Sequence, residues 1–283
     1  MTDNTTECQD MSPLILRSGP SSAEIYPDMG GRLGQLDLGT GPLLRGPAVD
    51  LGWVHWGCYP LLPWSNRLPG GHLAFGTIDE HLPVNWPDGT AIHGLAASCP
   101  WAVVERSEHS AKLEVRVSGG PYHVLGTQCF ELGPRELQLR LAVTNEGDRP
   151  VPVGLGIHPW FVGGRIRVPA DKRWPGEPMP SGYPEPVEGP YDLRGGTVPV
   201  AMDACFTSLT STVADVPGLR LHWDGPVTNL VVYSAEPGWI CVEPVTMANN
   251  GFELAQQGAP SHGVQVLAPE ESMEVLYRFE RQP

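Results

Sequence analysis

The 283-residue sequence lacks the features that mark several large classes of protein. No apolar stretch approaches the ~18 residues that a membrane-spanning helix needs. The polar, acidic start MTDNTTECQDMSP has neither the basic nor the apolar region of a secretory signal. The formal net charge of -14 disfavours nucleic acid as a partner, because its phosphate backbone would be repelled. We therefore expect a cytoplasmic protein that binds neither membranes nor nucleic acid.

Paired cysteines and metal-binding signatures are also missing. No CxxC pair and no HExxH motif occur, so the sequence gives no support for a metal site. In a chain of this length without a signal, free thiols are more common than a disulfide framework. We expect free thiols at all the cysteines, which are Cys8, Cys58, Cys99, Cys129, Cys205 and Cys241.

Helical periodicity is absent as well, whereas alternation of apolar and polar residues recurs. It is clear in AKLEVRVS (111–118) and ELQLRLAV (136–143), and the Gly-Pro turn in ELGPRE predicts a hairpin between the latter and HVLGTQCF (123–130). Further strands are expected in PLILRS, AEIYP, GRLGQLDL, WAVVER, VPVGLGI, LRLHW, NLVVYS, WICVEP, GVQVLA and MEVLYRFE. So many short strands predict an all-β fold, a large antiparallel β-sandwich forming a single domain over residues 1–283, with residues 1–12 as a flexible terminus.

Two regions do not follow this rhythm of strands. Residues 52–80 are rich in aromatic residues, glycine and proline, and residues 169–200 contain eight prolines. A long loop in a compact domain is often functional. Because the second region lies between His158 and Asp203, we expect it to form the rim of a site.

Ionisable residues stand next to apolar or turn residues in five short stretches: PWSNRLPGG, TAIHG, GIHPWF, MDACFTSL and WICVEPVT. Glu243 ends an apolar strand and precedes a proline, and a buried carboxylate is costly unless it is paired or functional. His158 also precedes a proline, so we expect it at the point where a strand stops. The structural alternatives are an ion pair of Glu243 with Arg67 and a hydrogen-bonded structural histidine at position 158.

The order and surroundings of these motifs resemble those of the aldose 1-epimerases, or galactose mutarotases. The correspondence runs from about Leu51 to the C-terminus and ends in VLAPEES, which is similar to the family's closing turn and last strand. The resemblance implies a galactose-mutarotase-like β-supersandwich and an isomerase that interconverts the anomers of a free sugar without a cofactor.

The resemblance also implies roles for individual residues. Glu243 resembles the general base and His158 the general acid. His93 resembles a second histidine near the ring oxygen. The remaining sugar contacts would be Asn66, Arg67, Asp203 and a stacking aromatic residue, with Trp160 as the main candidate beside Trp64 and Trp86.

The proposed chemistry is reasonable by itself. A sugar exchanges anomers by opening its ring and reclosing it on the other face of the carbonyl. Opening removes a proton from the anomeric hydroxyl while the ring oxygen receives one, and a carboxylate and an imidazolium suit these tasks. Charged side chains read sugar hydroxyls through charge-assisted hydrogen bonds.

In two positions the chain departs from the usual pattern and resembles a divergent branch of the family. Trp160 stands where family members commonly carry tyrosine, and PVTMANNGFE lacks the acidic residue that galactose-type enzymes have in this neighbourhood. IHGLAA lacks the arginine that would favour a sugar phosphate, so we expect an unphosphorylated sugar.

Other functions fit parts of the pattern. A non-catalytic carbohydrate-binding or regulatory protein would need only the sugar contacts. A glycoside hydrolase would use two carboxylates, Asp203 and Glu243, and would leave His158 without a role. A metal site could be built from His93, His158 and Glu243. The sequence is compatible with a monomer or a homodimer.

Overall fold

The computed structural model describes residues 12–48 and 51–282. Residues 1–11, which form almost all of the predicted flexible terminus and include Cys8, lie outside this range. The cysteines within it are free thiols, as expected. No helix in the described ranges is both long and apolar enough to cross a membrane.

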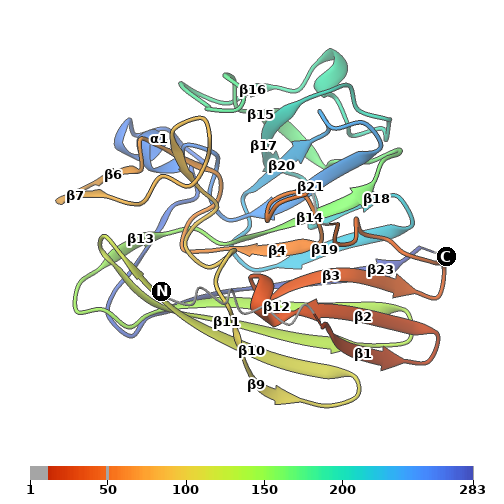
Figure 1. The fold of residues 1–283 in the computed structure, drawn as a ribbon. Coiled ribbons are helices and arrows are strands. Elements are labelled where there is room, and N and C mark those ends of the chain that lie inside the picture. Colours follow the sequence, from red (N-terminus) through yellow and green to blue (C-terminus); the bar gives the residue numbers. More distant parts are fainter. Residues whose placement is uncertain (1–11, 49–50, 283) are drawn as a thin grey trace, which may run out of the picture.

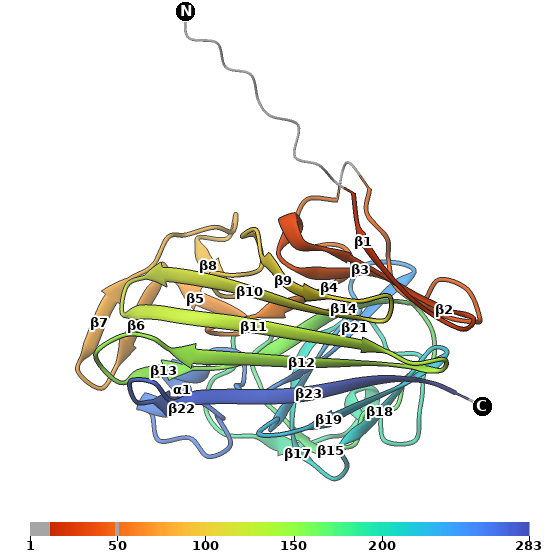
Figure 2. The same cartoon turned by 90° about the horizontal axis from the view of Figure 1, so that it is seen from below.

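Two large antiparallel sheets form the fold (Figures 1 and 2). The ten-stranded sheet contains, in spatial order, β1 (Leu14–Ser18), β2 (Ser21–Tyr26), β3 (Arg32–Leu38), β4 (Cys58–Leu61), β14 (Gly156–Val162), β21 (Trp239–Val245), β20 (Asn229–Tyr233), β17 (Asp203–Leu209), β15 (Ala170–Arg173) and β16 (Glu185–Pro186). The seven-stranded sheet contains β18 (Val213–Val216), β19 (Leu219–Asp224), β23 (Ser272–Arg281), β12 (Glu136–Asn145), β11 (Tyr122–Leu132), β10 (Ser110–Gly119) and β9 (Ala102–Arg106). The prediction of an antiparallel β-sandwich is confirmed.

Smaller elements lie outside the two large sheets. Three two-stranded ribbons pair β5 (Arg67–Pro69) with β8 (Thr90–Ile92), β6 (His72–Phe75) with β7 (Ile78–His81), and β13 (Val151–Val153) with β22 (Gln265–Leu267). The described helical turns are η1 (Pro27–Met29), η2 (Gly189–Tyr191) and α1 (Gly251–Gln256). Residues 52–80 therefore hold four strands, β4 to β7, which were not expected there. Three of them pair in short ribbons, where glycine and proline at the strand ends hide the alternating pattern.

The predicted hairpin is present. In β10 and β12 the apolar residues are buried and the polar residues between them are less so. β11 pairs with β12 in antiparallel register, with Leu132 opposite Leu137 at the turn. One face of this sheet is buried and the other is open, and this is the arrangement that produces a clear alternation in a sequence.

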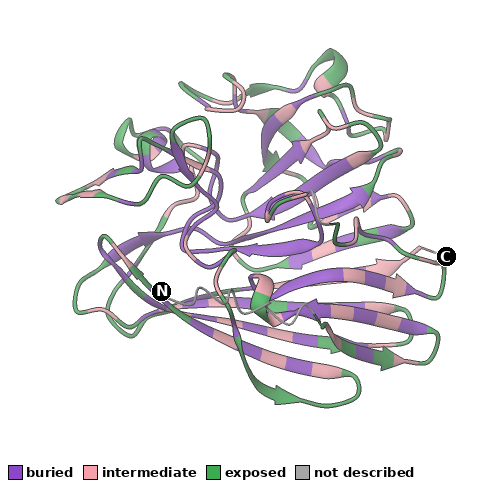
Figure 3. Ribbon diagram, viewed as in Figure 1, coloured by how far each residue is buried: buried purple, intermediate pink, exposed green. Residues whose placement is uncertain are grey.

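The central strands of the ten-stranded sheet are buried on both faces (Figure 3). In β14, Ile157 and Phe161 belong to the core between the sheets, whereas Trp160 belongs to a second apolar cluster on the other face. In β21, Val242 points to the core and Cys241 to the second cluster. This double burial explains why both segments read as apolar runs without clear alternation.

A buried arginine joins the sheet to two loops. Arg32 in β3 is fully buried, and its guanidinium donates to the carbonyl oxygens of Trp56 at 3.1 Å and Ala97 at 3.2 Å, and also to that of Met29. It lies over the rings of Trp56 and Tyr59, at 4.4 and 5.0 Å from their centroids. Burial lowers the pKa of Arg32 to about 10, which keeps it charged at neutral pH.

Replacing Arg32 by methionine should destabilise the protein strongly. Methionine fills much of the volume but leaves three carbonyl oxygens without their donor, so we expect a loss of about 3–5 kcal/mol in the free energy of unfolding. Urea denaturation measures it. Arg17→Met, at an exposed position of β1, is the matched control and should change stability by less than about 0.5 kcal/mol. Equal losses in the two variants would contradict the structural role of Arg32.

Candidate active site

A pocket opens on the face of the ten-stranded sheet that points away from the seven-stranded sheet. Counted out to the open solvent at its mouth, the space within it is about 490 Å³. Seven residues that the sequence singled out for a site line it: Asn66, Arg67, His93, His158, Trp160, Asp203 and Glu243. The other lining residues are Val54, His55, Tyr59, Trp86, Ile92 and Tyr233.

His158 and Glu243 face one another across the two central strands. Flanking residues of β14 and β21 pair with a constant offset that sets these two residues opposite each other: Gly156 with Val245, and Trp160 with Cys241. His158 Nε2 and Glu243 Oε1 lie 3.2 Å apart, and both side chains are more than nine-tenths buried. The prediction that the strand stops at His158 is wrong, since β14 continues to Val162.

Two prolines explain why a strand end was predicted at His158 and why His158 and Glu243 both face the pocket. Pro159 follows His158 and Pro244 follows Glu243, and neither has an N–H to donate. The pairing of β14 with β21 is interrupted at this point, whereas β14 still pairs with β4 through His158 and Pro159. The prolines therefore open the ladder on one side only, at the position where the two side chains face the pocket.

Aromatic rings pack against the imidazole of His158. Tyr59, directly opposite on β4, stacks on it with centroids 4.7 Å apart, and Trp160 stacks on it at 5.7 Å. Within the described chain, His158 Nδ1 has no hydrogen-bond partner. The Trp160 ring is itself fixed, because its Nε1 donates to the carbonyl oxygen of Val54 at 2.7 Å.

Burial opposes charge on both members of the pair. It lowers the pKa of His158 to about 3 and raises the pKa of Glu243 well above its usual range. The nearby Asp203 carboxylate also raises the pKa of Glu243, and Arg67 opposes this. Burial therefore favours the uncharged form of the pair, in which the proton that the two groups share resides on the carboxyl group rather than on the imidazole.

The β5–β8 ribbon brings three further residues into the pocket, namely Asn66, Arg67 and His93. Asn66 precedes β5 and His93 follows β8, and both adopt positive φ angles, of 59° and 62°. The His93 N–H donates to the Asn66 carbonyl oxygen at 2.9 Å. Gly94 follows with φ 78°, and a Cβ there would lie 1.9 Å from the Leu62 carbonyl oxygen, which accounts for the glycine of the IHG motif. Burial lowers the pKa of His93, so this imidazole is neutral.

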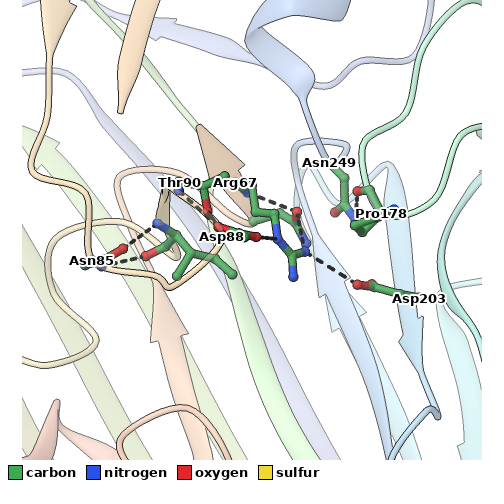
Figure 4. A network of polar contacts seen from close by, with 9 residues as sticks. Arg67, Asn85, Asp88, Thr90, Pro178, Asp203 and Asn249 are labelled. Carbon is green, nitrogen blue, oxygen red and sulfur yellow. Dashed lines mark hydrogen bonds and ion pairs between the residues drawn. The ribbon is translucent and has the colours of Figure 1, made fainter. Parts of the chain in front are cut away.

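Arg67 is the centre of a polar network (Figure 4). Its Nε donates to Asp88 Oδ2 at 2.9 Å. Its Nη1 makes longer contacts of 3.5 Å to Asp203 Oδ2 and to Asn66 Oδ1. Arg67 does not pair with Glu243, so the structural alternative of such an ion pair does not hold for the described residues.

The proline-rich segment 169–200 supports Asp203 but does not line the pocket. It contains β15, β16 and η2, and none of its residues is among those lining the pocket. Glu177 Oε2 accepts the backbone N–H of Asp203 at 3.0 Å, at the start of β17. Asp203 is largely buried, and burial raises its pKa against the effect of Arg67. The expectation that residues 169–200 form the rim of the site is therefore wrong, and the segment instead supports Asp203 from outside the pocket.

Several pocket residues escaped the sequence reasoning. Tyr59 in β4 and Tyr233 in β20 line the pocket. Both belong to largely apolar strands, in which a tyrosine cannot be told from an ordinary core residue. His55 belongs to an irregular loop and lies 5.5 Å from the Trp160 ring. Trp86 does line the pocket, whereas Trp64 is fully buried in the core between the sheets and cannot stack on a ligand there.

One set of side chains has the composition of a metal site. Ligand atoms of His158, Cys241 and Glu243 lie within 4.8 Å of one another, and all three residues are buried. The sequence alternative named His93 in place of Cys241. Burial raises the pKa of the Cys241 thiol well above its usual range, so a cation would have to displace its proton.

Comparison with known proteins places these observations in a context. The sequence profile of the aldose 1-epimerase family matches residues 22–279. YphB, an uncharacterized protein of Escherichia coli K12, is 33% identical over 141 residues, covering 47% of each chain. YihR, also uncharacterized and from the same organism, is 30% identical over 120 residues, covering 41% of this chain and 37% of its own. The chain thus spans less than half the length of these relatives.

Solved structures share the fold. One from Escherichia coli K12, whose name refers to aldose 1-epimerase, superimposes with a TM-score of 0.85 at 22% identity, covering 96% of this chain and 99% of that one. A galactose mutarotase-like protein from Clostridium acetobutylicum gives a TM-score of 0.81 at 20% identity, covering 95% of each chain. At this level of identity the likeness concerns the fold alone.

Proposed function

Because the chain belongs to the aldose 1-epimerase family, we propose that it interconverts the α and β anomers of a free, unphosphorylated monosaccharide. The observation that carries this proposal is the separation of 3.2 Å between His158 Nε2 and Glu243 Oε1 at the base of a pocket. The anomeric hydroxyl oxygen and the ring oxygen are bonded to the same carbon atom. A proton acceptor and a proton donor that serve both oxygens must therefore lie close together.

Ring opening moves one proton off the sugar and another onto it. In the assignment that the family suggests, Glu243 accepts the proton of the anomeric hydroxyl and His158 donates to the ring oxygen. The C–O bond then breaks, and the carbonyl forms. Rotation about the adjacent C–C bond presents the other face, and the two residues exchange roles for closure.

The single proton of the pair is sufficient for this cycle. If it resides on His158, Glu243 is the base. If it resides on Glu243, as burial favours, His158 is the base and the carboxyl is the acid. Either way the pair keeps its proton count through ring opening, so no net charge is added to a buried site.

The remaining polar side chains orient the sugar. Arg67 and Asn66 approach from one ribbon and Asp203 from the opposite wall, so donors and acceptors surround the space beside the catalytic pair. Trp86 and Trp160 offer apolar surfaces for a sugar face.

Polarimetry of freshly dissolved α-glucose, α-galactose and a panel of other aldoses tests the function. We expect the protein to accelerate the approach to anomeric equilibrium for at least one sugar, and the rate to be unchanged by EDTA. Binding without acceleration would instead support a carbohydrate-binding protein. A rate that EDTA abolishes and Zn²⁺ restores would overturn the metal-free mechanism and implicate the His158, Cys241 and Glu243 set.

A further inference from the structure

Asp88 is a carboxylate that acts on the pocket from outside it. It is not among the lining residues, and 40% of its side-chain surface is exposed. Its Oδ1 accepts the N–H of Thr90 at 3.0 Å and the Thr90 hydroxyl at 2.6 Å. Asn85 braces the same turn through two hydrogen bonds to the backbone of Ile92 (Figure 4). Asp88 is therefore held in place before any ligand arrives.

The second oxygen of Asp88 fixes the orientation of Arg67. Oδ2 accepts the Arg67 Nε–H at 2.9 Å, which is a normal hydrogen bond between charged groups. The contacts of Nη1 to Asp203 and Asn66, at 3.5 Å, are much weaker. Nη2 has no hydrogen-bond partner in the described chain. Asp88 thus occupies the Nε donor, whereas Nη2 and the weakly held Nη1 can turn to a ligand.

Asp88 also changes the charge that a ligand meets. Among the described residues lining the pocket, Arg67 is the only arginine or lysine. Two carboxylates, those of Asp88 and Asp203, form ion pairs with the Arg67 guanidinium, and the Arg67 side chain is only 16% exposed. The Thr90 and Arg67 hydrogen bonds lower the pKa of Asp88 against the effect of burial, so it is ionised at neutral pH.

We propose that Asp88 is a positioning and specificity-determining residue, which holds Arg67 toward the sugar and cancels its charge, so that the site prefers uncharged sugars to anionic ones. This inference rests on the proposed function. An anionic sugar would need a free cation, and here the cation is already paired. Without Asp88, Arg67 would keep only the longer ion pair of 3.5 Å to Asp203, and the charge beside the pocket would be one unit more positive.

Asp88→Asn tests the proposal with little change of shape. Because Oδ1 accepts two hydrogens from Thr90, the new amide nitrogen would face Arg67 Nε, donor against donor. We expect KM for a neutral aldose to rise about 3- to 10-fold with kcat changed less than about twofold. The ratio of kcat/KM for glucuronate to that for glucose should rise about tenfold, and the gain should shrink in high salt.

Two further variants support the reading of this result. Asp79→Asn, in β7 outside the pocket lining and 82% exposed, changes the net charge equally and should leave the ratio unchanged. Thr90→Val removes the hydroxyl that donates to Asp88, and should shift the ratio of kcat/KM values in the same direction by a smaller factor. This variant tests the proposal if Asp88→Asn does not fold. A ratio that stays constant while both activities fall together would overturn the proposal, since loss of structure alone affects the two sugars equally.

The outcome is separable from that of the proposed function. If the wild type accelerates no anomer exchange, the proposed function fails. The ratio of dissociation constants for glucose and glucuronate, measured from the change in tryptophan fluorescence, to which Trp86 and Trp160 of the pocket contribute, still tests Asp88. A tenfold shift in that ratio supports the role of Asp88, and an unchanged ratio overturns it.

Discussion

Glu243→Gln is expected to lower the catalysed rate of anomer exchange by about 10²–10⁴-fold while leaving the protein folded. Glutamine has nearly the shape of the protonated carboxyl that burial favours in this position. It carries no proton that the reaction can exchange, so ring opening loses one of its two partners. Because Glu243 lies only 3.2 Å from His158, no other described carboxylate of the pocket is in an equivalent place.

Polarimetry with the best aldose of the panel measures this loss. Glu105→Gln, on the exposed strand β9, is the matched control and should retain the full rate. A Glu243→Gln variant within twofold of the wild-type rate would remove Glu243 from the mechanism. Unfolded protein is distinguished by the urea midpoint, which should stay close to that of the wild type near pH 5.

The same variant should change how stability depends on pH. The folded pKa of Glu243 is raised above the unfolded value of 4.5, so its contribution to stability is complete below pH 4.5 and is lost as the pH rises toward the folded pKa. Glu243→Gln removes this loss. The free energy of unfolding of the variant should therefore gain on that of the wild type by about 1.4 kcal/mol per pH unit above pH 4.5. A constant difference between pH 5 and 8 would contradict a buried, protonated carboxyl.

The sequence predicted the sheets well and the shape of the site only in part. Strands such as β10 and β12 pack on one side, and their alternation is a local property of the chain. His158 was misplaced at a strand end because a proline shows only that a donor is missing, not which neighbouring strand loses it. Here β21 loses pairing and β4 keeps it, and this depends on strand order, which no local pattern contains.

The pocket residues that the sequence identified are unusual in their local sequence, whereas the residues that it missed are not. Glu243 and His158 are ionisable groups inside apolar strands, and Asn66, Arg67 and His93 stand in motifs. Tyr59 and Asp88 have ordinary local surroundings. Tyr59 matters because β4 sets it opposite His158, and Asp88 because a turn brings it to Arg67. Both contacts join segments that only the tertiary fold brings together.

His158→Asn is expected to reduce the rate by about 10²–10³-fold, without creating any dependence on metal ions. Asparagine keeps a hydrogen-bond donor near the ring oxygen but cannot transfer a proton. The Tyr59 and Trp160 rings, which stack on the imidazole, lose part of their contact, so some stability is lost as well. His109→Asn, in an exposed turn, is the matched control and should retain the full rate.

The pH dependence of stability separates the role of His158 from that of Glu243, because its sign is opposite. The folded pKa of His158, about 3, lies below the unfolded value of 6.5, so its contribution to stability is complete above pH 6.5 and is lost as the pH falls toward 3. His158→Asn removes this loss, and below pH 6.5 the variant should gain on the wild type by about 1.4 kcal/mol per pH unit of acidification. A parallel pH dependence in the two proteins below pH 6.5 would mean that the folded imidazole takes up its proton at the same pH as in the unfolded chain, and would contradict the lowered pKa of His158.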